Sequence, residues 1–264
     1  MSVRVEIFED EDRLAEELAR RIADALRREP SLVMGLPTGR TPIALYRELV
    51  RLFAAGAVDF SRATTFNLDE FLGVPPAHPG SYRQFMETHL FRHVNLDPAR
   101  VHMLNGAAPD PAAECARYEQ SIVEAGGIDL QVLGIGGNGH IGFNEPGPTL
   151  AARTHRITLE PGTRRANAAL FGDDVEQVPR EALSMGMATI LHARSIVLVA
   201  TGGFKASCVR AMLHGPLTTE LPASFLQVHR DVTVLLDEAA AAELPGGTGS
   251  NGHAVMPRAQ GRSH

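Results

Sequence analysis

Two neighbouring carboxylates, Asp69 and Glu70, directly follow a short apolar run of the chain. Asp69 is flanked by Phe66, Leu68 and Phe71, so partial desolvation is expected to favour uptake of a proton by its carboxylate. The alternative is that Asp69 caps a loop while Glu70 lies in solvent. Residue types alone favour this alternative.

A histidine, His140, lies in the glycine-rich segment 134–146, where four glycines in six positions let the backbone approach a ligand closely. Asn138 and Glu145 flank this histidine, and either side chain can orient an imidazole and select its tautomer. Gly136 and Gly137 are expected to contact the ligand. The poor helix sequence after the glycines argues against a dinucleotide fingerprint. The remaining histidines are scattered without metal-ligand spacing, so no metal is expected.

A third segment, residues 35–42, could bind a phosphate. The backbone around Gly39 and the hydroxyls of Thr38 and Thr41 face the start of a helix, with Thr41 as N-cap and Pro42 in the first helical position. The alternative is an ordinary strand–helix turn. The segment lacks the Gly-Lys-Ser/Thr ending of a Walker loop.

These segments sit in a regular alternation of apolar strands and amphipathic helices, which predicts an α/β three-layer sandwich on a mostly parallel sheet. Ligands bind such sheets at the carboxyl ends of the strands, so the three segments are expected to meet there. The predicted strands are 3–8, 32–36, 64–68, 101–104, 130–135, 195–201 and 232–236, and the predicted helices are 11–28, one from 41–42 onward, 81–93, 112–125 and 205–213.

Two segments fall outside the alternation. Residues 147–185 contain a polar strand-like piece at 154–159 and are interpreted as an excursion over the sheet, which could act as a mobile lid. Residues 245–264 are rich in Gly, Ser and Pro and are expected to be disordered. Residues 1–244 are therefore expected to form a single domain.

Composition narrows the class of protein. The 264 residues are 44% hydrophobic and 21% charged, which is typical of a globular domain. A net charge of −6 without a basic cluster argues against nucleic acid as a partner. No apolar run suits a signal peptide or a membrane span, so a cytoplasmic location is expected. The two isolated cysteines, Cys115 and Cys208, are expected to be reduced core residues. The oligomeric state is left open, a homo-oligomer included.

Together the three segments resemble the signature segments of the glucosamine-6-phosphate deaminase family. The resemblance is carried by LPTGRTP at 36–42, TFNLDEFLG at 65–73 followed by HPGSY, and GIGGNGHIGFNEP at 134–146. It runs from about residue 1 to about residue 238 and includes VPREALSMGMATIL at 178–191. The related 6-phosphogluconolactonases share the fold and a glycine-rich histidine loop, but not the FNEP ending. The resemblance implies a Rossmann-like fold of the deaminase and ribose-phosphate-isomerase type.

The resemblance also implies a reaction, in which glucosamine 6-phosphate and water give fructose 6-phosphate and ammonia without a cofactor. Asp69 would move a proton between C2 and C1 of the opened sugar. His140 would shuttle a proton during ring opening, with Glu145 and Asn138 positioning it. The residues implied for substrate binding are Thr38, Gly39, Thr41 and Lys205 at the phosphate, and Tyr82 at the sugar.

Three positions depart from the family pattern. Asn138 stands where many members have Asp, which removes a negative charge beside His140. Ala169 stands where the family usually has an Arg that clasps the phosphate. Arg40 stands where a small residue is common, and we expect Arg40 to supply part of the missing positive charge.

Other functions are weighed against this one. A lactonase acting on a phosphorylated sugar lactone is disfavoured by Asp69-Glu70 and by the FNEP ending. A non-catalytic sugar-phosphate sensor is supported only by the altered phosphate residues, and a nicotinamide-dependent oxidoreductase is weakened by the broken fingerprint. Another amino-sugar phosphate as substrate stays an open alternative.

Overall fold

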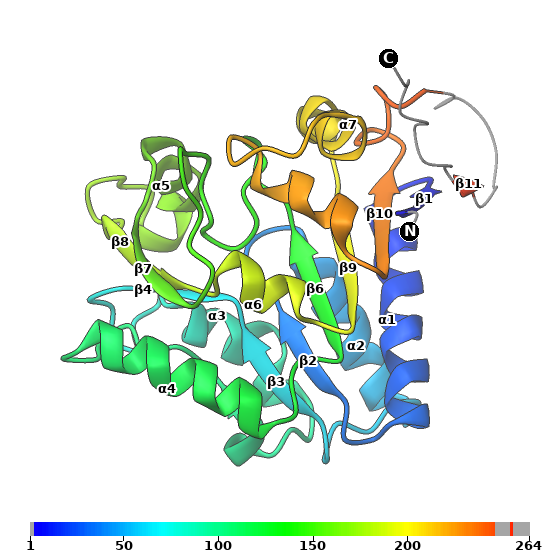
Figure 1. The fold of residues 1–264 in the computed structure, drawn as a ribbon. Helices are drawn as coiled ribbons and strands as arrows, with labels where there is room; N and C mark the ends of the chain where they lie inside the picture. Colours follow the sequence, from blue (N-terminus) through cyan, green and yellow to red (C-terminus); the bar gives the residue numbers. More distant parts are fainter. Residues whose placement is uncertain (1–2, 246–253, 256–264) are drawn as a thin grey trace.

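A large, mostly parallel sheet forms the centre of the computed structural model, which describes residues 3–245 and 254–255 (Figure 1). The strand order is β11-β1-β10-β9-β6-β2-β3-β5, in which β11 pairs antiparallel to β1 and the other pairs are parallel. Its strands are β1 (Arg4–Phe8), β2 (Val33–Leu36), β3 (Thr64–Asn67), β5 (Val101–His102), β6 (Leu130–Gly134), β9 (Ser195–Ala200), β10 (Val232–Asp237) and β11 (Ala254–Val255).

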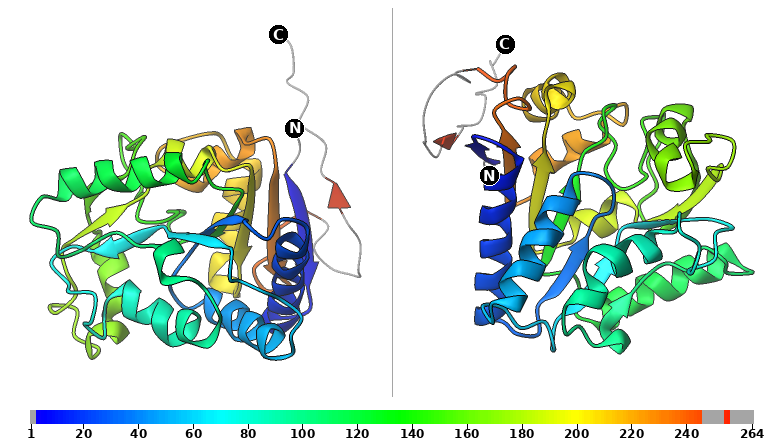
Figure 2. Two further views of the ribbon diagram at one scale, coloured as in Figure 1. Left: turned by 90° about the horizontal axis from the view of Figure 1, so that it is seen from below. Right: turned by 180° about the vertical axis from the view of Figure 1, so that it is seen from behind.

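Helices cover both faces of this sheet, as the view from below in Figure 2 shows. One hydrophobic cluster joins α1, α2 and α3 to one face, and another joins α4, α6 and α7 to the opposite face. The α-helices are α1 (Glu11–Arg28), α2 (Pro42–Ala54), α3 (Tyr82–His89), α4 (Pro111–Glu124), α5 (Pro161–Asn167), α6 (Met187–Leu191) and α7 (Ala206–His214). Short 3-10 helices are η1 (Phe91–His93), η2 (Pro98–Arg100), η3 (Ala168–Phe171), η4 (Gly203–Lys205) and η5 (Pro222–Val228). The predicted three-layer α/β sandwich is confirmed.

Helix α1 shows why local sequence determines this part of the fold. Leu14, Leu18 and Ile22 recur at helical spacing and are buried against the sheet. The carboxylate of Asp10 accepts a hydrogen bond from the backbone N–H of Arg13 at 2.8 Å, which caps the first turn. The helix therefore begins and ends where the sequence predicts.

A second, smaller antiparallel sheet lies beside the large one and was not predicted. Its order is β4-β8-β7, with β4 (Asp69–Phe71), β8 (Glu181–Ser184) and β7 (His155–Thr158). The strand-like piece expected at 154–159 corresponds to β7. Strands β4 and β8 contain too few residues to show a periodic pattern, and their pairing joins segments more than a hundred residues apart. Two strands of segment 147–185 are thus part of a sheet.

Some predicted element ends are wrong. The helix predicted over 81–93 ends at His89, and a 3-10 turn at 91–93 follows it. The strand predicted over 101–104 contains only Val101–His102. Cys115 and Cys208 are both free and buried, as expected. None of the helices in the described part of the chain combines the length and apolar character needed to span a lipid bilayer. Of the segment 245–264 predicted to be disordered, residues 246–253 and 256–264 lie outside the described residues.

Candidate active site

The three loops singled out in the sequence leave the carboxyl ends of β2, β3 and β6, which lie side by side in the sheet (Figure 1). The hydroxyl of Thr38, after β2, lies near the carboxylate of Asp69, after β3, and lowers its pKa. The carboxylate of Asp69 also lies beside the third loop, because a Cβ atom added to Gly142 would be 3.7 Å from Asp69 Oδ2. The loops therefore form one site, as the fold class predicts.

The predicted phosphate loop is held by a hydrogen bond from helix α2. The hydroxyl of Tyr46, a buried residue of α2, donates to the backbone carbonyl of Pro37. Gly39 has φ of 100°, a conformation that favours glycine. Thr41 occupies the N-cap position before Pro42, as predicted, but its backbone is already helical and its hydroxyl makes no capping bond. The backbone and hydroxyl groups of this loop lie at the N-terminus of α2, where an anion is favoured.

Asp69 is the first residue of β4 and is only 6% exposed. Burial, and to a lesser extent the charge of Glu70, raise the pKa of Asp69 to about 8, while the nearby hydroxyl of Thr38 opposes this rise. Within the described residues, Asp69 forms no ion pair with a lysine, arginine or histidine. A carboxylate in this environment has a high affinity for protons.

Glu70 corrects one expectation from the sequence, because it lies buried at 2% exposure and not in solvent. Its carboxylate accepts three backbone N–H groups at 2.9 Å, from Phe71, Tyr82 and Arg83. Burial raises the pKa of Glu70 to about 7, and these three donors oppose that rise. The capping role considered for Asp69 therefore belongs to Glu70, which leaves Asp69 available for chemistry.

His140, Asn138 and Glu145 lie together at the end of β6, as predicted. His140 Nδ1 is 3.3 Å from Glu145 Oε2, and the Asn138 side-chain amide donates to the same oxygen at 2.9 Å. Asn138 Oδ1 also accepts the backbone N–H of His140 at 3.2 Å. Burial alone raises the pKa of the Glu145 carboxyl, but His140, Thr163 and Asn138 together bring it below its usual value. Glu145 is therefore an anion that can orient the imidazole.

Glycine is required beneath His140. A Cβ atom at Gly136 would lie 2.3 Å from His140 Cε1, so any side chain there would displace the imidazole. At Gly137 an added Cβ atom would meet nothing within 4 Å, which leaves open space above the backbone.

Lys205 approaches the same loop from the start of α7. Its Nζ donates to the backbone carbonyl of Ile135 and lies 4.8 Å from the centre of the Phe204 ring. Burial lowers the pKa of Lys205. The ammonium group therefore lies at the end of β6, beside the strand that leads into the phosphate loop.

Tyr82 and the unpredicted helix α5 complete the surroundings of the site. The Tyr82 hydroxyl donates to Asn167 Oδ1 at 3.0 Å, and its ring stacks on Phe143 with ring centres 5.8 Å apart. The hydroxyl of Thr163 donates to Glu145 Oε1. Thr163 and Asn167 were missed in the sequence because α5 is short and polar, and nothing local links it to the glycine-rich loop.

Arg40 lies in the predicted phosphate loop, between Gly39 and Thr41. Its side chain is exposed, and its positive charge acts on Glu11 at the start of α1. Burial and Asp12 nevertheless raise the pKa of Glu11. No three His, Cys, Asp or Glu side chains of the described residues cluster as metal ligands would.

Known proteins of similar sequence and fold share this architecture. The family model of glucosamine-6-phosphate isomerases and 6-phosphogluconolactonases matches residues 9–235. A glucosamine-6-phosphate deaminase from Clostridium perfringens is 44% identical over 239 residues, which cover 90% of this chain and 98% of the relative. The solved structure of a monomeric glucosamine-6-phosphate deaminase is 43% identical, with a TM-score of 0.88 over 91% of this chain and 100% of the other. A 6-phosphogluconolactonase from Thermotoga maritima shares the fold, with a TM-score of 0.69, 20% identity and coverage of 89% and 98% of the two chains.

Proposed function

Because this chain belongs to the family of glucosamine-6-phosphate isomerases and 6-phosphogluconolactonases, we propose that it is a glucosamine-6-phosphate deaminase. The reaction takes glucosamine 6-phosphate and water to fructose 6-phosphate and ammonia. The observation that carries the proposal is the buried carboxylate of Asp69, held between the phosphate loop and the loop of His140.

The reaction begins with opening of the sugar ring. His140 passes a proton from the hydroxyl on C1 to the ring oxygen, which leaves an open-chain aldehyde. Glu145 supports this role because its carboxylate lies 3.3 Å from Nδ1 and stabilises the imidazolium while it carries the proton. Asn138 holds Glu145 in place with its amide group.

Asp69 then removes the proton from C2 and returns it to C1. The electron pair of the C2–H bond forms the C1=C2 double bond of an enolamine, while the aldehyde oxygen accepts a proton that the substrate ammonium group gives up. Protonation at C1 then leaves a C=N bond at C2. Water adds to that carbon and ammonia departs, which leaves the ketone of fructose 6-phosphate. Burial of Asp69 supports this step because enolisation requires a strong base shielded from water.

The positive charge of the substrate amino group is complementary to the carboxylate of Asp69. Without ligand, the raised pKa of Asp69 favours its protonated form near neutrality. An amino sugar brings an ammonium group to C2, beside the proton that Asp69 removes. This positive charge favours the ionised carboxylate, so substrate binding itself prepares the base.

The phosphate would bind to the loop at the N-terminus of α2. Thr38, Gly39 and Thr41 supply backbone and hydroxyl donors there, and Lys205 supplies a point charge. Arg40 is exposed and can turn toward an added phosphate. Arg164 does not replace the arginine absent at position 169, because its guanidinium donates to the carbonyls of Val175 and Val178 at 2.6 and 3.0 Å.

The small sheet limits which residues of the proposed lid, 147–185, can move. Strands β7 and β8 bound the segment and pair with each other, and β8 also pairs with β4. We propose that only residues 160–180, which include α5, move during turnover. Since Thr163 contacts Glu145 and Asn167 contacts Tyr82, such motion would reach both the proton shuttle and the sugar site.

Location and assembly follow from the proposed reaction. A sugar phosphate does not cross membranes unaided, so the proposal also puts the enzyme in the cytoplasm. All residues of the proposed site come from one chain, and the solved relative is itself described as monomeric. The proposal therefore requires no second copy of the chain.

The test is release of ammonia together with formation of fructose 6-phosphate. The substrates are the 6-phosphates of glucosamine, galactosamine and mannosamine, with the unphosphorylated sugars as controls and 6-phosphogluconolactone as the rival substrate. We expect ammonia from glucosamine 6-phosphate and little from the unphosphorylated sugars. Hydrolysis of the lactone without release of ammonia would support the lactonase, and binding of sugar phosphate without turnover would support a sensor.

A further inference from the structure

Glu70 joins the strand that carries the base to the helix that carries Tyr82. One oxygen of its carboxylate accepts the N–H groups of Phe71 in β4 and Tyr82 in α3, and the other accepts the N–H of Arg83. Each of these hydrogen bonds is 2.9 Å long, and the side chain is almost fully buried. The hydroxyl of Thr38 lies near the side chains of both Asp69 and Tyr82 and acts on the pKa of each, so Glu70 ties together two of the elements that surround Thr38.

Capping of α3 does not by itself explain a carboxylate here. Ser81 already occupies the N-cap position, and its hydroxyl accepts the backbone N–H of Gln84 at 3.0 Å. Burial of a negative charge is costly even when hydrogen bonds compensate for lost hydration. A neutral acceptor would close the end of a helix with less desolvation.

Among the described residues, Glu70 is almost the only charged group that acts on Asp69. The other titratable groups that face Asp69 are the hydroxyls of Tyr46 from α2, Tyr82 from α3 and Tyr118 from α4. Burial, first of all, raises the pKa of each tyrosine well above its usual value, so all three are neutral. Apart from burial, Glu70 is therefore the main cause of the high proton affinity of Asp69.

We propose that Glu70 is a positioning residue for the deamination, which holds Asp69 beside the phosphate loop and supplies the negative charge that makes its carboxylate a strong proton acceptor. This inference rests on the proposed function. It assigns the two adjacent carboxylates different tasks, since Asp69 transfers the proton and Glu70 sets where and how readily it does so.

Substitution of Glu70 by glutamine separates this role from capping. In Glu70→Gln the carbonyl oxygen can still accept from Phe71 and Tyr82, but an amide N–H group would face the N–H of Arg83. The acid limb of kcat/KM reports ionisation of the base in the free enzyme. We expect this limb to move to lower pH by about one unit, and kcat to fall by about tenfold to a hundredfold. Substrate titration is the same for every variant and cancels in the comparison.

Two further variants serve as controls. Ser81→Ala removes the neutral cap of the same helix and should lower the thermal midpoint without moving the acid limb. Glu70→Asp keeps the charge but shortens the reach to α3, so its acid limb should stay near that of the unmodified enzyme while kcat falls. If Glu70→Gln does not fold, a large shift of the acid limb in Glu70→Asp would still contradict the charge effect.

A second readout does not depend on turnover. Carbon-13 NMR of the Asp69 carboxyl in the ligand-free protein should show its titration midpoint at lower pH in Glu70→Gln than in the unmodified chain. An unchanged midpoint together with an unchanged acid limb would overturn the inference and leave Glu70 as a cap only. Absence of ammonia release from the unmodified protein would overturn the proposed function, while the NMR titration would still test the influence of Glu70.

Discussion

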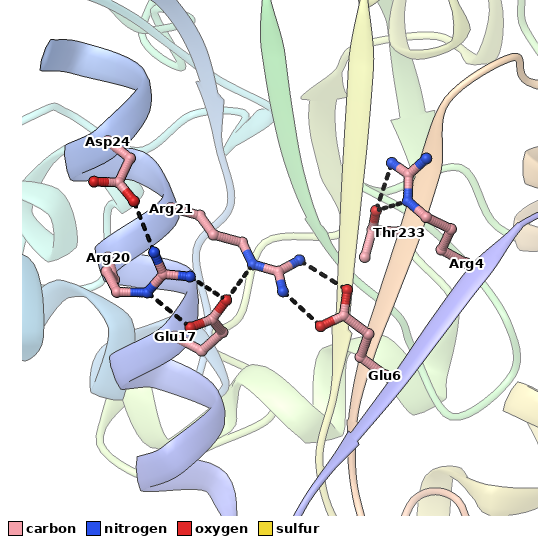
Figure 3. A network of polar contacts seen from close by, with 7 residues as sticks. All are labelled: Arg4, Glu6, Glu17, Arg20, Arg21, Asp24 and Thr233. Atoms are coloured by element: carbon pink, nitrogen blue, oxygen red, sulfur yellow. Dashed lines mark hydrogen bonds and ion pairs between the residues drawn. The ribbon is translucent and has the colours of Figure 1, made fainter. Parts of the chain in front are cut away.

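Charged side chains are paired on the outer face of α1, whereas the two adjacent carboxylates of the proposed active site form no ion pair within the described part of the chain. On the outer face, Arg21 donates to both oxygens of Glu6 in β1 and to Glu17, as Figure 3 shows. Arg20 bridges Glu17 and Asp24 along the same helix. Opposite charges are paired at this face, and water reaches most of them.

In the site, Asp69 and Glu70 are adjacent, buried and without an ion-pair partner among the described residues. Paired surface charges contribute little to stability and leave the pKa of an acid unchanged or lowered. Burial at two consecutive positions raises the pKa of both carboxyls at a cost in stability, and the charge of Glu70 raises the pKa of Asp69 further. The difference indicates that the outer face serves the fold, whereas the site keeps an unfavourable arrangement that suits proton transfer.

The largest effect is expected for Asp69→Asn, which removes the proposed base while keeping the side-chain shape. Activity should fall by about a hundredfold to ten-thousandfold, because general base catalysis contributes on this scale. The pKa of Asp69 is raised in the folded protein, so its contribution to stability is present at low pH and is lost as pH rises toward about 8. The variant should therefore become more stable than the unmodified enzyme as pH rises, in urea unfolding at pH 5 and pH 8.5.

The matched control for this variant lies on the outer face. Asp24→Asn makes the same chemical change at a carboxylate paired with Arg20 and Arg27 at 2.8 and 2.6 Å. It should not gain stability at high pH and should keep full activity. A similar gain in both variants would remove the contrast between the two regions.

A smaller effect is expected for Arg40→Ala. If Arg40 supplies charge to the phosphate, the KM for a phosphorylated amino sugar should rise tenfold or more, about 1.4 kcal/mol, with little change in kcat. Arg47→Ala is the control, because Arg47 is an exposed arginine of α2 that pairs with Asp12 at 2.5 Å. An unchanged KM in Arg40→Ala would show that the phosphate loop and Lys205 suffice.

The smallest effect is expected for Arg21→Ala. This change leaves Glu6, whose side chain is 14% exposed, without its partner and should lower the free energy of unfolding by about 1 kcal/mol. The loss should shrink in 1 M salt, because the Debye length falls to about 3 Å. Steady-state assays should find kcat and KM unchanged. A large loss of activity would mean that the outer face is coupled to the site.

Local patterns predicted much of the fold. Helix α1 was predicted to the residue because its buried leucines and acidic cap all lie within the helix or next to it. The grouping of Thr38, Asp69 and His140 followed from the rule that loops at one edge of a parallel sheet meet. The specific substrate came from the resemblance and not from the residue types alone.

What was missed depends on contacts between distant segments. Strand β8 is four residues long and forms by pairing with both β4 and β7. The sequence could not decide which of the two carboxylates was buried as a cap, since that depends on where α3 begins in space. Contacts made by Thr163 and Asn167 were missed for the same reason.

The abrupt passage from β3 to β4 sets the directions in which the two carboxylates point. Only Leu68 separates the two strands, and Asp69 stands opposite Ser184 while Glu70 stands opposite Leu183. Consecutive side chains of a strand point to opposite sides, so inserting a single residue at this junction would exchange their directions. The carboxylate with three backbone donors would then face the sugar, and the proton acceptor would face the end of a helix.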